Sequence, residues 1–322
     1  MEDRIDLLLV LYLLLRHPSE AEIVNVVDWQ FKRHTKGSGK LSRIRVQLSI
    51  APYRAVVSGD LASIRVTGKI VWASLEEGLK GRTVGIDLRV GEPFRLRCSE
   101  RWLEVLKLRG PIRKTRLVLC VFDERHGVVA TVNGSIAEVY SSTYSPGGKY
   151  YGEVEADLQA EVRRLVEKAV EEARRAGAAC VVACPAVLRR QAERLKRDLG
   201  SFEIVEVEVG GLEGVLQVLR RDEVRRRFAD NEVVSNILLS EAIARYADRG
   251  TLVYGVEEVA AAVSARTIRY LIMTRGFVVE NLDAAVEWVV EMLRARRGVR
   301  VVDETTPLGV AVSRLGGAVG MI

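Results

Sequence analysis

The first 110 residues begin with one apolar segment and continue as short runs in which apolar and polar positions alternate. The apolar segment predicts a helix over residues 6–16, which ends before Pro18 because the residue ahead of a proline disfavours helical geometry. Alternating runs such as residues 44–50 and 83–90 follow, separated by turns that contain glycine. Several short strands with regular breaks are typical of a small all-β barrel.

Residues 111–221 predict a different arrangement, in which a hairpin precedes alternating strands and helices. An apolar strand is expected over 116–123, and strands over 127–132 and 135–140 flank Asn133-Gly134, a strong hairpin signal. The runs that follow predict a helix over 153–177, a strand over 178–184, a helix over 186–199, a strand over 202–209 and a helix from 212. This order indicates a mixed sheet covered by helices.

Residues 222–322 predict a compact α/β/α unit. The pattern favours helices over 224–249, 256–264, 281–296 and 307–315, strands over 267–273 and 298–302, and an apolar end at 318–322. A chain of 322 residues exceeds the size at which a single core is usual. We therefore expect a multidomain α+β protein with domains at 1–110, 111–221 and 222–322.

The basic surplus of the chain is confined to its first third. Residues 1–110 contain 19 Lys and Arg against 13 Asp and Glu, which accounts for the whole net charge of +6. No carboxylate occurs between Trp29 and Tyr53, where two strand-like runs flank a glycine-containing tip at residues 35–40. Basic side chains at such a tip can bind nucleic acid, because each one displaces counterions from the phosphates. The alternative is an ordinary solvated turn without a binding role. The basic residues of this hairpin are Lys32, Arg33, Lys36, Lys40, Arg43 and Arg45.

Several common active-site patterns are absent from the sequence. No G-x-x-x-x-G-K-[ST] phosphate loop and no G-x-S-x-G elbow occurs, and His17, His34 and His126 have no metal-binding spacing. Cys180 and Cys184 lie four residues apart in an apolar strand, which suits buried thiols better than zinc or a disulfide. The sequence therefore implies no intrinsic cofactor and no metal site.

The apolar run at residues 7–15 is short, and the acidic residues Glu2 and Asp3 precede it. A membrane span needs about 20 apolar residues, and a signal peptide needs a basic start. Neither is therefore expected. The cysteine pattern favours reduced thiols, so we expect a cytoplasmic protein without membrane contact.

A nuclease centre is the remaining catalytic option. Asp123 ends the first strand of the central segment, and it is followed by further carboxylates at Glu124, Glu138, Glu153, Glu155 and Asp157. A two-metal nuclease needs several carboxylates around ions about 4 Å apart, and the sequence does not show that these residues converge. Turn capping by Asp123 is the favoured interpretation, and catalysis by Asp123 is the alternative.

The order of these segments resembles Pelota, the ribosome-rescue paralogue of the eukaryotic and archaeal class-one release factors, in its archaeal form. The resemblance covers essentially the whole chain, and it depends on the order and spacing of short motifs. These are VTGKIV at 66–71, GEPF at 91–94, ERW at 100–102, SPGGK at 145–149, GGLEGVLQVL at 210–219, YGVEEV at 254–259 and LGGA at 315–318.

The resemblance implies an N-terminal Sm-like β-barrel, a central ribonuclease-H-like domain and a C-terminal α/β/α domain of the kink-turn-binding ribosomal-protein type. It also implies a monomeric factor that enters the A site of a stalled ribosome with an elongation-factor-1-alpha-like GTPase and GTP. An ABC-type recycling ATPase then separates the subunits. The basic hairpin, including His34 and Thr35, would reach mRNA and ribosomal RNA at the decoding site. The GTPase would contact the loop residues Pro146, Gly147, Gly148 and Lys149.

Three differences from these related families refine this expectation. Release factors hydrolyse peptidyl-tRNA with Gly-Gly-Gln, whereas Gly-Gly is followed here by Lys149, Leu212 and Ala318, so this activity is not expected. The family begins with a strand, but here the predicted helix starts almost at Met1, and a second glycine enlarges the Pro-Gly-Lys loop. Rescue without catalysis is the leading hypothesis. The alternatives are a divalent-metal-dependent endoribonuclease that cuts mRNA on stalled ribosomes and an RNA-binding module that acts away from ribosomes.

Overall fold

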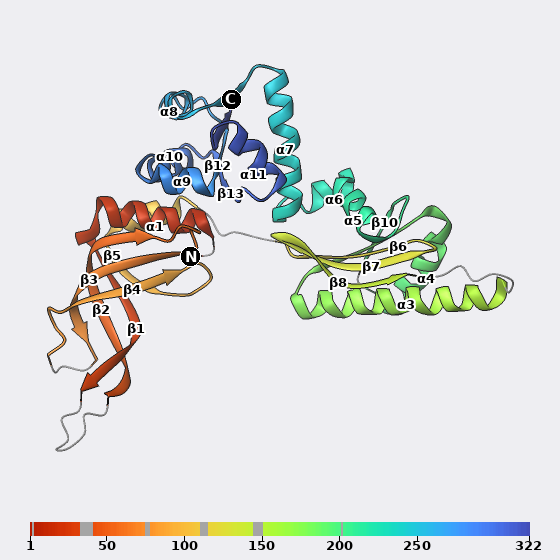
Figure 1. The fold of residues 1–322 in the computed structure, drawn as a ribbon, viewed down its shortest axis with the longest axis horizontal. Coiled ribbons are helices and arrows are strands. Elements are labelled where there is room, and N and C mark those ends of the chain that lie inside the picture. Colours follow the sequence, from red (N-terminus) through yellow and green to blue (C-terminus); the bar gives the residue numbers. More distant parts are fainter. Residues whose placement is uncertain (2, 33–40, 75–77, 110–114, 144–150, 201) are drawn as a thin grey trace. The chain divides into compact units, whose positions relative to one another are not determined.

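The structure is a computed structural model that describes the chain except residues 2, 33–40, 75–77, 110–114, 144–150 and 201 (Figure 1). For residues 26–32, 41–44 and 151–157 it describes the backbone but not the side chains. The chain forms two compact units: unit 1 is Met1–Ile112 with Ile243–Ile322, and unit 2 is Arg113–Ala242. In the described ranges, no helix is both long enough and apolar enough to cross a membrane.

The barrel sheet of unit 1 has five antiparallel strands in the order β4-β3-β2-β1-β5. Its strands are β1 (Ala21–Lys32), β2 (Leu41–Val57), β3 (Ser63–Ala73), β4 (Thr83–Arg89) and β5 (Arg95–Cys98). Along β3, Ile64 and Val66 are buried while Arg65 between them is exposed, because successive side chains of a strand point to opposite faces. Helix α2 (Glu100–Lys107) follows β5 and buries Trp102 completely. The predicted antiparallel β domain is confirmed, but β1 and β2, with 12 and 17 residues, are longer than the short strands expected, and helix α2 was not predicted.

Helix α1 (Arg4–Arg16) is apolar on all sides, and every side chain from Leu7 to Leu14 is buried. Asp3 caps its first turn by accepting backbone N–H groups through its carboxylate. One side of α1 packs against the barrel, and another packs against α10 (Leu282–Arg294). Full burial of a leucine side chain contributes about 1.5–3 kcal/mol. This helix therefore joins the apolar cores of both sheets of unit 1.

The second sheet of unit 1 has the strand order β11-β14-β12-β13, in which β12 and β13 are parallel and β14 is antiparallel to both neighbours. Besides α10, its elements are β11 (Leu252–Tyr254), α8 (Val256–Ser264), β12 (Tyr270–Thr274), α9 (Arg275–Glu280), β13 (Gly298–Val302), α11 (Pro307–Arg314) and β14 (Ala318–Met321). Arg4 and Arg16 of α1 form ion pairs with Asp303 and Glu287 of this region. The predicted α/β/α arrangement is confirmed, and β11 and β14 are additional strands that the pattern did not predict.

Unit 2 contains a mixed sheet in the order β10-β9-β6-β7-β8, with β6, β9 and β10 parallel and β6, β7 and β8 antiparallel. Its elements are β6 (Leu117–Phe122), β7 (His126–Asn133), β8 (Ser135–Thr143), α3 (Tyr151–Ala176), β9 (Ala179–Cys184), α4 (Arg189–Leu199), β10 (Glu203–Glu206), α5 (Gly211–Arg220), α6 (Asp222–Arg227) and α7 (Glu232–Asp248). Helices α3 and α4 cover one face, and α5, α6 and the start of α7 cover the other (Figure 1). Strand β6 is buried on both faces because Val118 packs toward α3 while Leu119 packs toward α5. The predicted hairpin-first mixed sheet is confirmed.

Residues 222–242, which the sequence assigns to the third domain, pack within unit 2. Val224, Phe228 and Val234 of this segment are buried in the same apolar core as β6 and β7. The division of the chain into three domains stays a prediction.

Candidate nucleic-acid interface

The hairpin formed by β1 and β2 extends beyond the barrel sheet (Figure 1). Its two strands pair antiparallel as far as Lys32 and Leu41. β5 pairs with β1 only as far as Val24, and β3 pairs with β2 only from Leu48 onward. Beyond those positions the described parts of β1 and β2 pair only with each other, so they form a two-stranded ribbon. The two strands that flank the predicted tip are confirmed.

The predicted RNA-binding residues belong to the outer end of this ribbon or to the segment that joins its strands. Lys32 ends β1 and Arg43 lies opposite Gln30 in β2, but their side chains are not described. Five further candidates lie outside the described residues: Arg33, His34, Thr35, Lys36 and Lys40. Their role in RNA binding stays a prediction. Arg45, further along β2, is described and exposed.

A row of residues crosses four strands at the base of the ribbon. Arg95 of β5 lies opposite Val24 of β1, Val24 lies opposite Ser49 of β2, and Ser49 lies opposite Trp72 of β3. Neighbouring strands are about 4.8 Å apart, so the backbones of Arg95 and Trp72 are separated by roughly 14 Å. Arg95 is exposed and Trp72 is 50% exposed. The row therefore presents a cation and an aromatic ring on the outer surface of the barrel.

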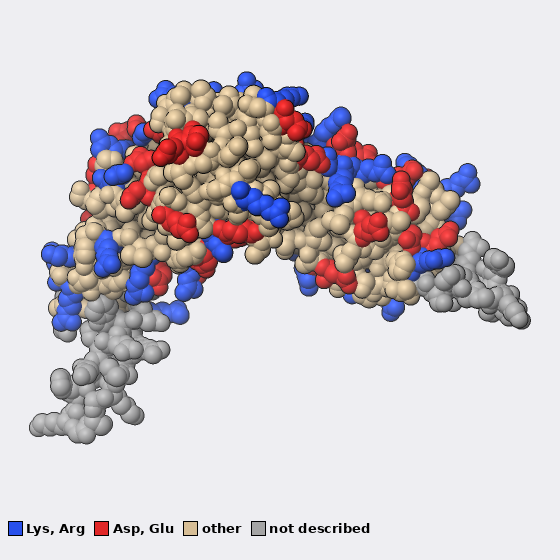
Figure 2. All heavy atoms as spheres, turned by 45° about the horizontal axis from the view of Figure 1, so that its top comes forward, with Lys and Arg blue, Asp and Glu red and all other residues tan. Residues whose placement is uncertain are grey.

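A surface hollow of about 490 Å³ lies at the Arg95 end of this row and is lined by Val24, Asn25, Gln47, Pro93, Phe94 and Arg95. Nearby, Glu22 accepts a hydrogen bond from Ser49 Oγ at 2.9 Å and lies 3.9 Å from Nη1 of Arg97. The carboxylate of Glu22 is thus partly neutralised. Figure 2 shows further Lys and Arg side chains on the described barrel surface at the lower left of the view. A basic surface beside an exposed aromatic ring is the combination that binds single-stranded nucleic acid.

Trp72 and Arg95 were not among the residues expected from the sequence. Simple alternation along β3 would direct position 72 inward, on the same side as Ile70. However, Ile70 and Trp72 pair with successive residues of β2, which leaves Val71 as the extra residue of a β-bulge. The bulge reverses the alternation and turns Trp72 outward. The Arg-Leu-Arg alternation of residues 95–97 is a signal that could have identified Arg95.

Asp123 follows β6 and binds three backbone N–H groups. Its Oδ1 accepts from Arg125 and His126 at 2.6 and 2.7 Å, and its Oδ2 accepts from Gly210 at 2.7 Å. Burial tends to raise the pKa of Asp123, but these hydrogen bonds outweigh burial and hold the pKa below its ordinary value. The carboxylate therefore ties the β6–β7 turn to the residue that precedes α5. This is the turn-capping role that the sequence favoured.

The other carboxylates considered for a nuclease are distributed over the central unit. Glu124 and Glu138 are exposed. The side chains of three more are not described: Glu153, Glu155 and Asp157. Among the residues that the structure does describe, no three or more His, Cys, Asp or Glu side chains are grouped so that they could hold a metal ion.

The predicted GTPase-contacting residues lie between β8, which ends at Thr143, and α3, which begins at Tyr151. β8 is an edge strand of the mixed sheet. The candidates themselves lie outside the described residues: Pro146, Gly147, Gly148 and Lys149. Their contact with a GTPase stays a prediction.

The chain combines an antiparallel β-sheet domain, a mixed sheet with helices on both faces and a small four-stranded sheet with its own helices. No protein-family profile matches the chain. The pelota homologue of Thermococcus kodakarensis is 26% identical over 275 residues, which cover 80% of this chain and 77% of the relative. The pelota homologue of Aeropyrum pernix is 26% identical over 299 residues, which cover 89% of this chain and 84% of the relative.

The crystal structure of the Thermoplasma acidophilum Pelota protein aligns with the whole of this chain and with 94% of its own. The TM-score is 0.55 and the sequence identity is 14%, so this likeness shows the fold. This likeness is consistent with the expected layout of an Sm-like β-barrel, a ribonuclease-H-like domain and an α/β/α domain of the kink-turn-binding ribosomal-protein type. The predicted resemblance to archaeal Pelota is confirmed.

Proposed function

We propose that this protein is a ribosome-rescue and mRNA-surveillance factor. It enters the A site of a stalled ribosome together with an elongation-factor-1-alpha-like GTPase that carries GTP, and an ABC-type ATPase then separates the subunits. The observation that carries the proposal is the β1–β2 ribbon, which extends beyond the barrel sheet in the basic third of the chain. The Pelota relatives and the Pelota fold support the same function.

The proposed contribution of this chain is binding rather than catalysis. The sequence contains no Gly-Gly-Gln for peptidyl-tRNA hydrolysis, and both oxygens of Asp123 are occupied by backbone N–H groups. In this proposal the partners hydrolyse nucleotide, and the chain needs no cofactor of its own. In this proposal the Lys and Arg side chains of the ribbon contact RNA phosphates. Arg95 and Trp72 extend the binding surface, Arg95 by pairing with a phosphate and Trp72 by stacking its exposed indole on a base. Nothing among the described residues favours the endoribonuclease alternative.

Neutralising the ribbon tests this proposal. Replacing Lys32, Arg33, Lys36 and Lys40 together by alanine should weaken binding to stalled ribosomes while binding to the purified translational GTPase persists. Each lost phosphate contact reduces the salt dependence of binding by about one unit of slope, so the slope should fall by up to about four. The measurement is cosedimentation with ribosomes stalled on a truncated mRNA, at several salt concentrations.

The matched control removes the same amount of charge from exposed positions elsewhere, by replacing Arg164, Arg249, Arg297 and Arg314 with alanine. This control should bind ribosomes as the unmodified protein does. Normal ribosome binding by the ribbon variant, or loss of its GTPase binding, would contradict the roles assigned here.

A further inference from the structure

The outer edge of β10 is paired with no described strand. On its inner side β10 pairs in parallel with β9, and Val207, just after β10, donates its N–H to the carbonyl oxygen of Cys184. Backbone groups alternate in direction along an extended strand, so the N–H and C=O groups of Ile204 and Glu206 point to the open edge. Unpaired groups of this kind are a template for the addition of another strand.

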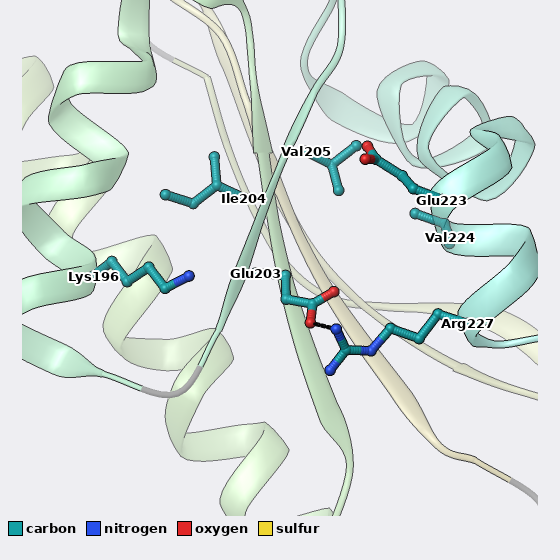
Figure 3. A pocket seen from close by; sticks show the side chains of 7 residues that line it. All are labelled: Lys196, Glu203, Ile204, Val205, Glu223, Val224 and Arg227. Carbon is teal, nitrogen blue, oxygen red and sulfur yellow. Dashed lines mark ion pairs between the residues drawn. The ribbon is translucent and has the colours of Figure 1, made fainter.

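A groove of about 380 Å³ lies at this open edge, between α4 and α6 (Figure 3). Ile204 points toward α4, which contributes Lys196 to the groove. Val205 points toward α6, which contributes Val224 and Glu223. The groove therefore combines an open strand edge, apolar side chains at its floor and charged side chains on both walls.

The α4 wall of the groove carries a basic surplus, because helix α4 contains five Arg and Lys against two Asp and Glu. The α6 wall contributes one acid and one base to the groove, Glu223 and Arg227. Glu203 at the floor is neutralised by an ion pair with Arg227 (Figure 3). Lys196 forms no ion pair with any residue that the structure describes. Charge complementarity therefore favours an occupant that is negatively charged on its α4-facing side.

We propose that this groove binds an extended acidic peptide segment of a partner protein, which adds to the sheet as a sixth strand beside β10. The outward backbone groups of Ile204 and Glu206 supply the ladder hydrogen bonds, as in other cases of strand addition. Side chains of the added strand alternate between two faces. Acidic residues then face Lys196, and small apolar residues face Val205 and Val224.

An RNA strand would supply negative charge but would not match the rest of the groove. The open backbone donors and acceptors of Ile204 and Glu206 are complementary to another peptide backbone. The residues that line the groove include no aromatic ring on which a base could stack. Glu223 on the α6 wall opposes a continuous row of phosphates, whereas a peptide places its acidic side chains on the α4 side alone.

A fluorescein-labelled hexapeptide of alternating glutamate and valine is the probe, titrated with the full chain and followed by fluorescence anisotropy. Ile204→Pro removes an outward N–H group without removing a hydrogen bond to β9. Proline is tolerated on edge strands, so the fold should persist. The affinity for the probe should weaken by about tenfold or more. Lys196→Glu should weaken binding similarly by repulsion. Arg164→Glu, an exposed charge reversal on α3, should leave binding unchanged.

Amide hydrogen exchange supplies a measurement that needs no variant: the probe should slow the exchange of the Ile204 and Glu206 amides. Equal binding of a lysine–valine hexapeptide, or unchanged affinity in both groove variants, would overturn the proposal. So would the absence of both binding and exchange protection. A labelled uridine oligonucleotide that binds more tightly than the acidic peptide, and that Lys196→Glu releases but Ile204→Pro does not, would assign the groove to RNA instead.

Discussion

Replacing Asp123 by asparagine separates a structural carboxylate from a catalytic one. The amide of Asp123→Asn can keep one oxygen for Arg125 and His126, but it then directs an N–H group at the N–H of Gly210. Hydrogen bonds to charged groups contribute about 1.5–3 kcal/mol each, and a buried donor left without a partner costs a similar amount. We therefore expect Asp123→Asn to lower the free energy of unfolding of unit 2 by about 2–4 kcal/mol.

The packing around Gly210 leaves little room for this loss to be relieved. A Cβ atom built on Gly210 would lie 2.7 Å from the backbone nitrogen of Asp123 and 2.9 Å from its Cγ. Both distances are shorter than any ordinary carbon contact, so the two chain segments are already in close approach. The nearest other oxygen, the carbonyl oxygen of His126, already accepts the N–H of Asp123, so the Gly210 N–H would have to share it after the substitution.

The pH dependence of the effect follows from the pKa of Asp123, which is lower in the folded protein than its ordinary value. A carboxyl group with a lowered folded pKa stabilises the protein fully above its unfolded pKa of about 3.9. That stabilisation is lost as the pH falls through the folded pKa. The difference in unfolding free energy between the unmodified protein and Asp123→Asn should stay constant from about pH 8 to 5 and shrink below about pH 4.

Guanidinium unfolding followed by far-UV circular dichroism measures this difference. All four tryptophans of the chain lie in unit 1, so their fluorescence reports unit 1 separately and should change little. Glu124→Gln is the matched control, because Glu124 is the exposed neighbouring carboxylate. The same preparations are incubated with RNA and manganese. Unchanged stability of Asp123→Asn, combined with the loss of a metal-dependent cleavage activity, would refute the structural assignment and support the endoribonuclease.

Two further predictions concern buried side chains. Burial raises the pKa of the Cys180 thiol to about 12, whereas Cys98 is partly exposed. Cys98 should therefore react with Ellman's reagent in the native protein at pH 8 well before Cys180 does. Equal reaction rates of the two thiols would contradict this prediction. Asn231 donates to the carbonyl oxygens of Thr115 and Val132 and accepts N–H groups at the start of α7, so Asn231→Ala should destabilise unit 2 by about 2–4 kcal/mol in chemical denaturation. A loss below about 0.5 kcal/mol would show that water replaces these bonds.

Hydrophobic periodicity was sufficient to predict most of the secondary structure. The six consecutive buried residues of β6 and the alternation along β3 correspond directly to patterns in the sequence. The strands β11 and β14 were missed because each has only three or four residues, too few to show a period. Their assignment depends on pairing with each other and with β12, which is a property of the assembled sheet.

Two features of the candidate sites could not be predicted from the sequence. The partner of Asp123 is Gly210, which is 87 residues away along the chain. The Gly-Gly pair at 210–211 signals a tight turn before a helix, but it does not identify which side chain approaches that turn. Trp72 is a similar case, because one inserted residue in β3 reverses its direction and no local pattern marks the insertion. Both features arise from how segments pair in space.

Helix α1 shows how a pattern can give the extent of burial but not its partners. A helix that is apolar all round is expected to be covered on all sides, and Leu7 to Leu14 are indeed all buried. If each predicted domain had a separate core, the N-terminal domain of about 110 residues would have to cover every side of this helix by itself. Instead the barrel covers one side and α10 covers another, so two segments separated by unit 2 in the sequence share one apolar core. The nine-residue apolar run is therefore better explained as an internal interface of unit 1 than as part of the barrel core alone.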